Sequence, residues 1–171
     1  MKNIIKLITR KMRADIALRY IEPRETHLDI GCGVEKYLLK RSPCREKIGY
    51  DELLGDHISK KIPIDRADYI TMLAVIEHLE YPEEIIKECH RILTDEGLMI
   101  ITTPKENAET IIRLYTGKSK KEMDETHKQY FNKQNMEDLL IGVFTIEEYR
   151  LFEFGLNQLF VCKKVPKTRR K

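Results

Sequence analysis

The sequence predicts a doubly wound α/β fold: a three-layer α/β/α sandwich with a mostly parallel sheet and an antiparallel C-terminal hairpin. Short apolar runs alternate with helical patterns along most of the chain, which is typical of β-α-β units with right-handed crossovers. The run at 68–73 is almost continuously apolar, as in parallel strands that are buried on both faces. Two further runs near the C-terminus are separated only by Gly155 and Leu156, which indicates a hairpin.

Each element follows from its own local pattern. Apolar residues at helical spacing predict an amphipathic helix from 3 to 20. Another helix should begin at Pro82, because proline suits the first helical position and Glu83 and Glu84 follow it in the first turn. The predicted strands span residues 26–30, 47–50, 68–73, 98–103, 144–154 and 157–163, and the other predicted helices span residues 34–40, 107–115 and 135–141. The lysine-rich stretch at 116–126 is predicted to be a loop.

Length and composition indicate one globular domain at 1–163, followed by a short basic tail at 164–171 that we expect to be disordered. The chain has 171 residues, enough to bury about two thirds of its unfolded surface. Six of its 31 basic residues lie at 163–171, so the rest of the chain carries 25 basic and 28 acidic residues. Such a tail either recruits nucleic acid or anionic lipid or is simply a solvated end. No cluster of basic and aromatic residues precedes it, so a nucleic-acid substrate is not favoured.

The sequence also bears on compartment and membrane contact. No apolar run approaches the ~18 residues of a membrane span. The four cysteines form no CxxC pair and the five histidines show no ligand spacing, so neither a disulfide framework nor a metal site is predicted, and a reducing cytoplasm is expected. Up to Arg13 the N-terminal helix carries basic residues and no acidic ones. It either lies on an anionic membrane as a peripheral contact or packs on the domain.

The most informative stretch runs from Leu28 to Gly33. An apolar strand ends with Asp29 and Ile30, and a Gly-x-Gly turn begins at Gly31. Two glycines let the backbone approach a ligand without an intervening Cβ, and the N–H groups that follow offer hydrogen-bond donors. A second acidic residue, Asp51, closes the next apolar run about 20 residues after the first glycine, which is where a β-α-β unit places a carboxylate against ribose hydroxyls. As an alternative, each carboxylate caps a turn or a helix.

One position of the turn distinguishes two classes of nucleoside cofactor. A dinucleotide fingerprint requires a third glycine where this chain has Lys36, which disfavours a nicotinamide cofactor. In its motifs the chain instead resembles the class I S-adenosylmethionine-dependent methyltransferases, and within them the small type 11 and type 23 enzymes. The resemblance runs from about Thr26 to Lys163 and is carried by Leu28-Asp29-Ile30-Gly31-Cys32-Gly33, Gly49-Tyr50-Asp51 and the segment from Asp68-Tyr69-Ile70 to Glu77-His78-Leu79.

The resemblance implies a Rossmann-like fold with S-adenosylmethionine bound at the carboxyl ends of the strands. Gly31 and Gly33 would leave room for the methionine moiety and the adenosine. Asp29 would orient the amino end of the cofactor, and Asp51 would accept hydrogen bonds from both ribose hydroxyls. Charge-assisted bonds of that type contribute on the order of 1.5–3 kcal/mol each. The other cofactor-binding positions that the resemblance implies are Cys32, Glu52, Leu73 and Ala74.

The chain departs from the family pattern in two places. Glu35 stands where the family has glycine, and its carboxylate would either face solvent or narrow the pocket. The segment at 52–66 is shorter than the helix and strand that the family usually places there. Because of these departures, a degenerate module that binds S-adenosylmethionine without activity is an alternative to an enzyme.

Two histidines are the candidate catalytic residues. His78 follows Glu77 in a pair that the family often carries after this strand, and it acts either as a base or as a side chain that holds the loop. His127 belongs to Thr126-His127-Lys128-Gln129-Tyr130-Phe131, which resembles an H-x-x-Y-F element of methyltransferases from cell-surface polysaccharide and lipid gene clusters; there it would face the substrate. The remaining histidines, which show no context beyond surface or packing, are His27, His57 and His90.

The resulting prediction is a small S-adenosylmethionine-dependent methyltransferase that acts on a small-molecule or cell-surface glycan or lipid acceptor. Because the sulfonium methyl is already activated, the protein would mainly supply positioning and at most one base. A nucleotide-binding oxidoreductase is the less favoured alternative. Acceptor pockets are built from loops that a single sequence does not place, so the acceptor itself is not predicted.

Overall fold

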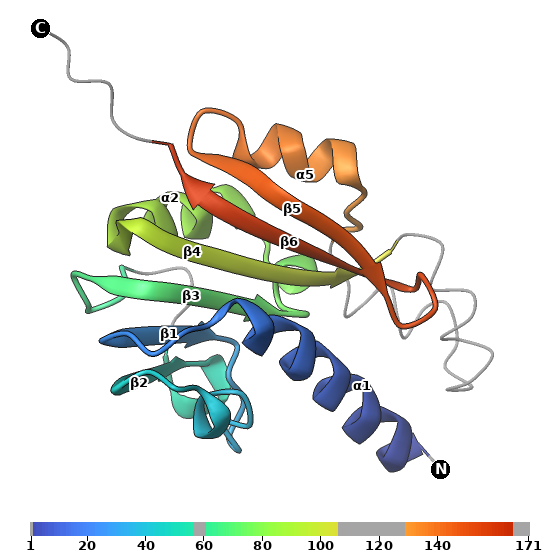
Figure 1. The fold of residues 1–171 in the computed structure, drawn as a ribbon. Coiled ribbons are helices and arrows are strands. Elements are labelled where there is room, and N and C mark those ends of the chain that lie inside the picture. The colour runs from blue at the N-terminus through green and yellow to red at the C-terminus, as the bar shows by residue number, and fades with distance from the viewer. Residues whose placement is uncertain (1, 57–60, 106–128, 166–171) are drawn as a thin grey trace, which may run out of the picture.

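A mixed six-stranded sheet forms the middle layer of the molecule (Figure 1). The computed structural model describes residues 2–56, 61–105 and 129–165. The strands are β1 (Thr26–Ile30), β2 (Glu46–Tyr50), β3 (Ala67–Leu73), β4 (Leu93–Pro104), β5 (Phe144–Phe152) and β6 (Asn157–Lys164). They lie in the order β2-β1-β3-β4-β6-β5, with the first four parallel and β6 antiparallel to both neighbours. The predicted parallel sheet with a C-terminal hairpin is confirmed.

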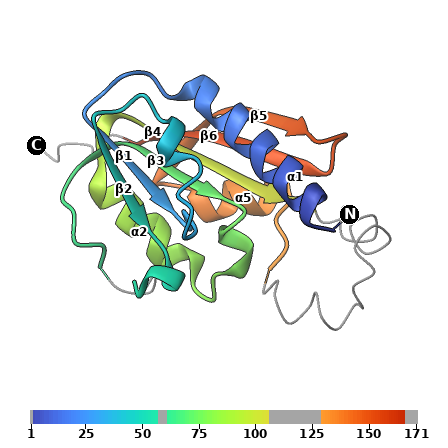
Figure 2. The same ribbon diagram turned by 90° about the horizontal axis from the view of Figure 1, so that it is seen from below.

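Helices cover both faces of this sheet (Figure 2). The helices are α1 (Lys2–Ala17), α2 (Pro82–Ile92) and α5 (Lys133–Leu140). α1 crosses one face, while α2 and α5 lie on the other. Because successive strand residues point to opposite faces, each central strand contributes to two cores. On the α1 side, Tyr69, Ile100 and Val161 of three neighbouring strands form one cluster with Ala14 and Ala17.

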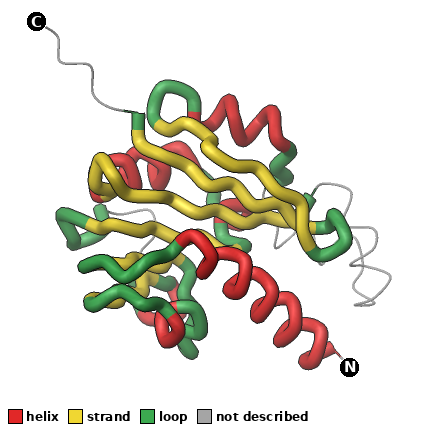
Figure 3. The backbone as a smooth tube through the Cα atoms, viewed as in Figure 1, coloured by secondary structure: helices red, strands yellow, loops and turns green. Residues whose placement is uncertain are grey.

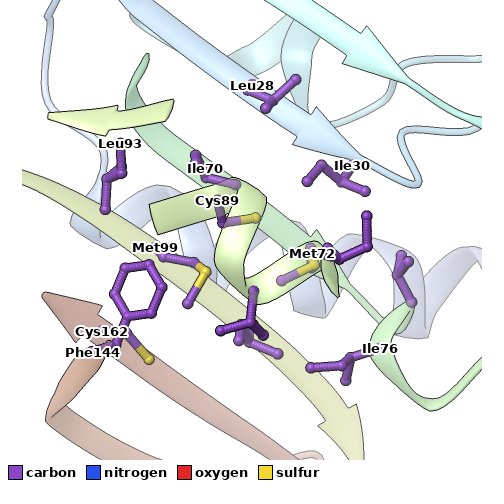
Figure 4. Packing of buried hydrophobic residues seen from close by; sticks show 14 of the residues in the cluster. Leu28, Ile30, Ile70, Met72, Ile76, Cys89, Leu93, Met99, Phe144 and Cys162 are labelled. Atoms are coloured by element: carbon purple, nitrogen blue, oxygen red, sulfur yellow. The ribbon is translucent and has the colours of Figure 1, made fainter. Parts of the chain in front are cut away.

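The larger core lies under α2 and α5, and Figure 4 shows the part of it under α2. Cys89 of α2 lies over the sheet among Ile70, Met72 and Met99, and all four side chains are fully buried. Burial of each such side chain stabilises the fold by about 1.5–3 kcal/mol. α2 begins at Pro82, as predicted, and passes directly into β4. β4 therefore starts five residues earlier than the sequence predicts.

The predicted helix at 34–40 is wrong. The chain after β1 forms consecutive turns, and only Leu39–Arg41 makes a 3₁₀ helix (Figure 3). Lys36 adopts a left-handed backbone with φ 48°, which interrupts α-helical geometry. The segment also lies directly on β2, because a Cβ at Gly49 would come within 2.6 Å of the Cys32 Sγ. Tertiary packing on β2 thus overrides the local helical pattern.

The shortened segment after β2 is held by side chains of α2. The described parts of 52–66 contain a 3₁₀ helix at Glu52–Leu54 and no strand, so β2 forms the edge of the described sheet. The Arg91 guanidinium donates to the carbonyls of Ile62 at 3.1 Å and Ile64 at 2.8 Å, and Glu88 accepts from the Ile62 N–H at 2.9 Å. The predicted helix at 107–115, the loop at 116–126, His57 and most of the basic tail lie outside the described residues.

Candidate active site

The Gly-x-Gly turn at the end of β1 uses the conformational freedom of both glycines. Gly31 has φ 75° and Gly33 has φ 64°, both in the left-handed region. At Gly31 there is also no room for a side chain, since a Cβ would lie 2.1 Å from the Cγ2 of Val75. At Gly33 no atom lies within 4 Å of the corresponding point. The turn is therefore closed against the loop after β3 on one side and open on the other.

Asp51 connects the end of β2 to this turn. Its Oδ2 accepts from the Gly33 N–H at 2.7 Å, and its Oδ1 accepts from the Leu53 N–H at 2.8 Å. The second bond caps the 3₁₀ helix at Glu52–Leu54. The capping role that the sequence left open is thus present, and Asp51 is buried behind the turn. Each of its oxygens retains a lone pair for a further donor.

A cavity of about 370 Å³ opens beside the turn, at the carboxyl end of β1. Its volume lies within the usual range of ligand pockets, about 300–1,000 Å³. Five of the predicted cofactor-binding residues line it: Asp29, Gly31, Cys32, Gly33 and Leu73. The other lining residues are Arg10, Arg13, Ala14, Val34, Glu35, Tyr37, Leu38 and Leu53. The predicted residues Asp51, Glu52 and Ala74 do not line it; Glu52 is exposed, and Ala74 follows Leu73 with φ 58°.

Arg10 and Arg13 of α1 form the wall that the sequence did not predict. Arg13 is partly buried, and burial lowers its guanidinium pKa against the opposing effect of Glu153 and Glu77. Arg10 pairs with Glu35 at 2.5 Å and lies 4.9 Å from the centre of the Tyr37 ring. Glu35 therefore both lines the cavity and fastens α1 to the turn. The one signal in the sequence was the helical spacing of two basic residues beside the small Ala14 and Ala17.

Asp29 is the buried acid of the cavity. Only 4% of it is exposed, and burial, with a smaller contribution from Asp51, raises its pKa to about 7. The Thr71 hydroxyl donates to its Oδ1 at 2.6 Å and lowers the pKa part of the way back. Asp29 lies opposite Thr71 in the β1–β3 register. Near neutral pH this carboxyl therefore changes its ionisation at the surface where a ligand would bind.

Only one member of the Glu77-His78 pair faces inward. His78 is exposed at the end of the 3₁₀ helix Ile76–His78, whereas Glu77 is 2% exposed. No hydrogen bond of ordinary geometry reaches the Glu77 carboxylate from the described residues, but its own backbone N–H and the Thr103 hydroxyl of β4 lie close enough to favour its charged form. Burial raises the Glu77 pKa, and that backbone N–H, the charge of His78, the Thr103 hydroxyl and the charge of Arg13 offset part of the effect. His127, the other candidate, lies outside the described residues.

Other kinds of site find little support in the described part of the chain. It contains no group of three or more histidine, cysteine or acidic side chains arranged to hold a metal ion. None of its helices is long and apolar enough to span a membrane. All four cysteines are free and buried, and burial raises the thiol pKa of Cys32 to about 11.

Comparisons with known proteins agree with the geometry. Solved structures share the fold. A Haloferax volcanii methyltransferase in complex with the activator Trm112 gives a TM-score of 0.71 at 14% identity and covers 90% of this chain and 89% of that one. A SAM-dependent methyltransferase from Archaeoglobus fulgidus gives a TM-score of 0.65 at 19% identity over 93% of this chain and 94% of that one. A Thermotoga maritima SAM-dependent methyltransferase, described as a possible histamine N-methyltransferase, gives a TM-score of 0.67 at 19% identity over 93% and 92% of the two chains.

Two sequence matches go beyond the fold. The ubiquinone biosynthesis O-methyltransferase of Glaesserella parasuis is 28% identical over 74 residues, which is 43% of this chain and 30% of that protein. The chain thus matches less than a third of the length of this relative. A family model described as a methyltransferase domain matches residues 4–142, most of the chain and nearly all of the site described above. The chain therefore belongs to the S-adenosylmethionine-dependent methyltransferases, with S-adenosylmethionine as its cofactor.

Proposed function

We propose that the protein methylates a hydroxyl oxygen of a small molecule or of a cell-surface glycan or lipid, and that it does so in the cytoplasm. The ubiquinone biosynthesis relative, named an O-methyltransferase, favours oxygen as the accepting atom. The motif around His127 supports a surface glycan or lipid as one acceptor class. A reducing compartment suits four buried free thiols.

The observation that carries the proposed methyl transfer is the charge distribution of the cavity beside the glycine turn, because it suits the cofactor that donates the methyl group. Asp29 lies on the wall formed by β1, and Arg10 and Arg13 lie on the wall formed by α1. The amino acid end of S-adenosylmethionine carries an ammonium and a carboxylate. We assign the ammonium to Asp29 and the carboxylate to Arg13, because Arg10 already has Glu35 as its partner. The residues present thus fit the cofactor.

The nucleoside end is assigned to the other side of the turn. Asp51 would accept from the ribose hydroxyls, in addition to the two N–H groups that already hold its carboxylate in place. Because those bonds fix the side chain before the ligand arrives, less conformational entropy is lost on binding. Cys32 and Leu73 provide apolar surface along the cavity.

The cofactor supplies an electrophilic methyl group. The chain contributes a shaped pocket, the orientation of the two reactants and a group that receives the proton of the acceptor hydroxyl. His78 and His127 are our candidates for that group. His78 occupies the exposed end of the loop after β3, so a bound acceptor would have to approach from that surface.

Calorimetric titration tests the cofactor site, and a methyl-transfer assay tests the enzyme. We expect S-adenosylmethionine and S-adenosylhomocysteine to bind and NAD not to bind. Transfer of labelled methyl to a panel of hydroxylated acceptors, including lipid-linked sugars and phenols, then identifies the acceptor class. Binding without transfer to any acceptor would favour the non-catalytic module, and tighter binding of NAD would contradict the assignment.

A further inference from the structure

Three hydrogen bonds between side chains connect Asp29, near the carboxyl end of β1, to Ser42 in the loop after the 3₁₀ helix at Leu39–Arg41. The Ser42 Oγ lies 2.9 Å from the Nδ1 of His27, and the Nε2 of His27 lies 2.9 Å from the Oγ1 of Thr71. Thr71 in turn donates to Asp29 Oδ1 at 2.6 Å. All four residues are buried, His27 and Thr71 completely. This chain of side chains, which we call the Ser42–Asp29 relay, ends at the wall of the cavity.

The relay follows from strand register. His27 and Asp29 are two residues apart on β1, so both point to the α1 face of the sheet. Thr71 lies opposite Asp29 on β3 and shares that face. Ser42 comes from the loop immediately after the 3₁₀ helix at Leu39–Arg41. A contiguous polar path of this kind inside two strands is costly unless each group has a partner, and here each has one.

Counting donors gives the relay a direction. An ionised Asp29 only accepts, so the Thr71 hydroxyl proton points to it, and the Thr71 oxygen must accept from His27 Nε2–H. The Nδ1 of a neutral His27 then carries no proton and accepts from the Ser42 hydroxyl. Ser42 Oγ accepts from the Cys44 N–H at 3.3 Å. Burial, aided by the charge of Lys47, lowers the His27 pKa to about 4, so the ring is neutral as this scheme requires.

We propose that the Ser42–Asp29 relay is a positioning device for the cofactor: a neutral His27, protonated on Nε2, fixes the Thr71 hydroxyl on one oxygen of Asp29 and so presents the ionised carboxylate to the amino end of S-adenosylmethionine. The inference rests on the cofactor role proposed for Asp29. His27, Thr71 and Ser42 touch no ligand in this scheme. They act through Asp29, and none of them is a catalytic residue.

Other charged groups also act on Asp29. Asp51 opposes its ionisation from the end of β2, whereas Arg10 and Arg13 of α1 line the same cavity with positive charge. Cys32 in the turn is neutral near pH 7, since its thiol pKa is raised to about 11. Around His27, Lys47 lies on β2 and the Tyr69 ring packs edge-on at 6.5 Å. Removal of the Thr71 hydroxyl leaves all of these groups in place.

Nuclear magnetic resonance tests the relay without any ligand. In protein labelled with ¹⁵N-histidine, we expect the His27 ring to be neutral, protonated on Nε2 and bare at Nδ1 above about pH 7, where Asp29 is ionised. The ring should stay neutral until the pH approaches 4. A ring protonated on Nδ1, or one that titrates near the ordinary histidine pKa of about 6.5, would overturn the proposed direction.

Three threonine variants test the effect on the cofactor. Thr71→Val removes the hydroxyl from a β-branched side chain of similar shape, and Thr71→Ser keeps the hydroxyl. Thr102→Val is the matched control, because Thr102 is equally buried on the neighbouring strand β4 and its hydroxyl has no partner in the described part of the chain. We expect Thr71→Val to bind S-adenosylhomocysteine at least about tenfold more weakly at pH 7, since a hydrogen bond to a charged group is lost. Thr71→Ser should recover most of this loss, and Thr102→Val should bind like the parent.

The pH profile separates positioning from general damage. Affinity should rise with pH as Asp29 ionises, and Thr71→Val should move the midpoint of that rise to higher pH, because the hydroxyl lowers the Asp29 pKa. A Thr71→Val protein with reduced stability but an unshifted midpoint would overturn the relay. Asp29→Asn separates the two proposals: unchanged affinity in that variant refutes the cofactor role of Asp29 itself. Reduced affinity in Asp29→Asn, combined with normal affinity in Thr71→Val, refutes only the relay.

Discussion

Replacement of Gly31 by alanine tests how the glycine turn shapes the cofactor cavity. Gly31 lines the cavity and has φ 75°. A Cβ there would lie 2.1 Å from Val75 Cγ2 and 3.3 Å from both Val75 Cβ and Cγ1. Rotation of a short branched side chain does not clear three such contacts. Either the turn or the loop after β3 must therefore move.

The magnitude is the sum of two separable effects. A left-handed backbone costs an alanine about 1–2 kcal/mol. Overpacking of a well-packed site costs about 1–3 kcal/mol more. We therefore expect Gly31→Ala to lower the free energy of unfolding by about 2–5 kcal/mol, a large share of the about 5–15 kcal/mol of a typical domain. Gly33→Ala is the matched control, because Gly33 has φ 64° and nothing within 4 Å of its would-be Cβ. It should show the backbone effect alone.

Urea unfolding of Gly31→Ala, Gly33→Ala, Val75→Ala and the double variant Gly31→Ala/Val75→Ala measures both effects. We expect the double variant to show a coupling of about 1–3 kcal/mol, because truncation of Val75 relieves the clash. Affinity for S-adenosylhomocysteine should fall more in Gly31→Ala than in Gly33→Ala. Equal destabilisation by the two alanines, with no coupling to Val75, would refute the inference that the turn is closed against the loop after β3.

Three further variants address single charges of the site. Asp51→Ala should weaken S-adenosylhomocysteine binding by about 1.5–3 kcal/mol in calorimetry. Asp51→Asn is the control, because its amide oxygen can still accept the hydrogen bond from the Gly33 N–H. Unchanged affinity in a folded Asp51→Ala variant argues against the assignment of Asp51 to the ribose. Glu35→Gly should bind S-adenosylhomocysteine equally or more tightly than the parent. The exposed Arg10–Glu35 ion pair contributes at most about 1 kcal/mol to stability, and its loss frees Arg10. Clearly weaker binding would make Glu35 a ligand of the cofactor. The pKa of Asp29 is about 7 in the folded protein and about 3.9 in the unfolded chain, so between these values the folded state binds the extra proton. The free energy of unfolding of the ligand-free protein, measured relative to that of Asp29→Asn, should therefore fall by up to about 4 kcal/mol between about pH 4 and 7. Denaturant unfolding of both proteins across that range gives this difference in stability. A difference that does not change with pH would contradict the raised pKa of the buried Asp29 carboxyl.

Local patterns were sufficient to predict most of the fold. The continuous apolar run in β3 and the proline at the start of α2 depend on nearest neighbours, and both elements were predicted within a few residues. The segment after β1 shows the opposite case. Its residues favour a helix locally, but the bond from Gly33 to Asp51 and the close contact with Gly49 hold it in turns. Both contacts come from β2 or from the residue directly after it, so no window around the segment contains them.

The residues of the candidate site fall into the same two groups: some follow from local sequence patterns, and others depend on contacts that are distant in sequence. Residues that belong to a motif with fixed spacing, such as Asp29 and the two glycines, were predicted and line the cavity. Arg10 and Arg13 were missed because the angle at which α1 crosses the sheet decides which of its side chains reach the site. In the sequence, Glu77 stands out only as part of a motif. It is nevertheless the buried member of its pair, and that burial depends on the packing of the loop after β3.

His27 shows what the sequence did contain but did not reveal. In strands buried on both faces, a polar residue must find a partner on its own face or leave a costly unsatisfied group. His27 stands two residues before the acid of the glycine motif, so the alternation of β1 already placed both on one face. Thr71 and Thr102 are buried threonines on the neighbouring strands β3 and β4, and of these two only Thr71 has a partner for its hydroxyl in the described structure. Alternation therefore identifies the face that a buried polar residue shares, whereas the register between strands decides which of those residues joins the relay to Asp29.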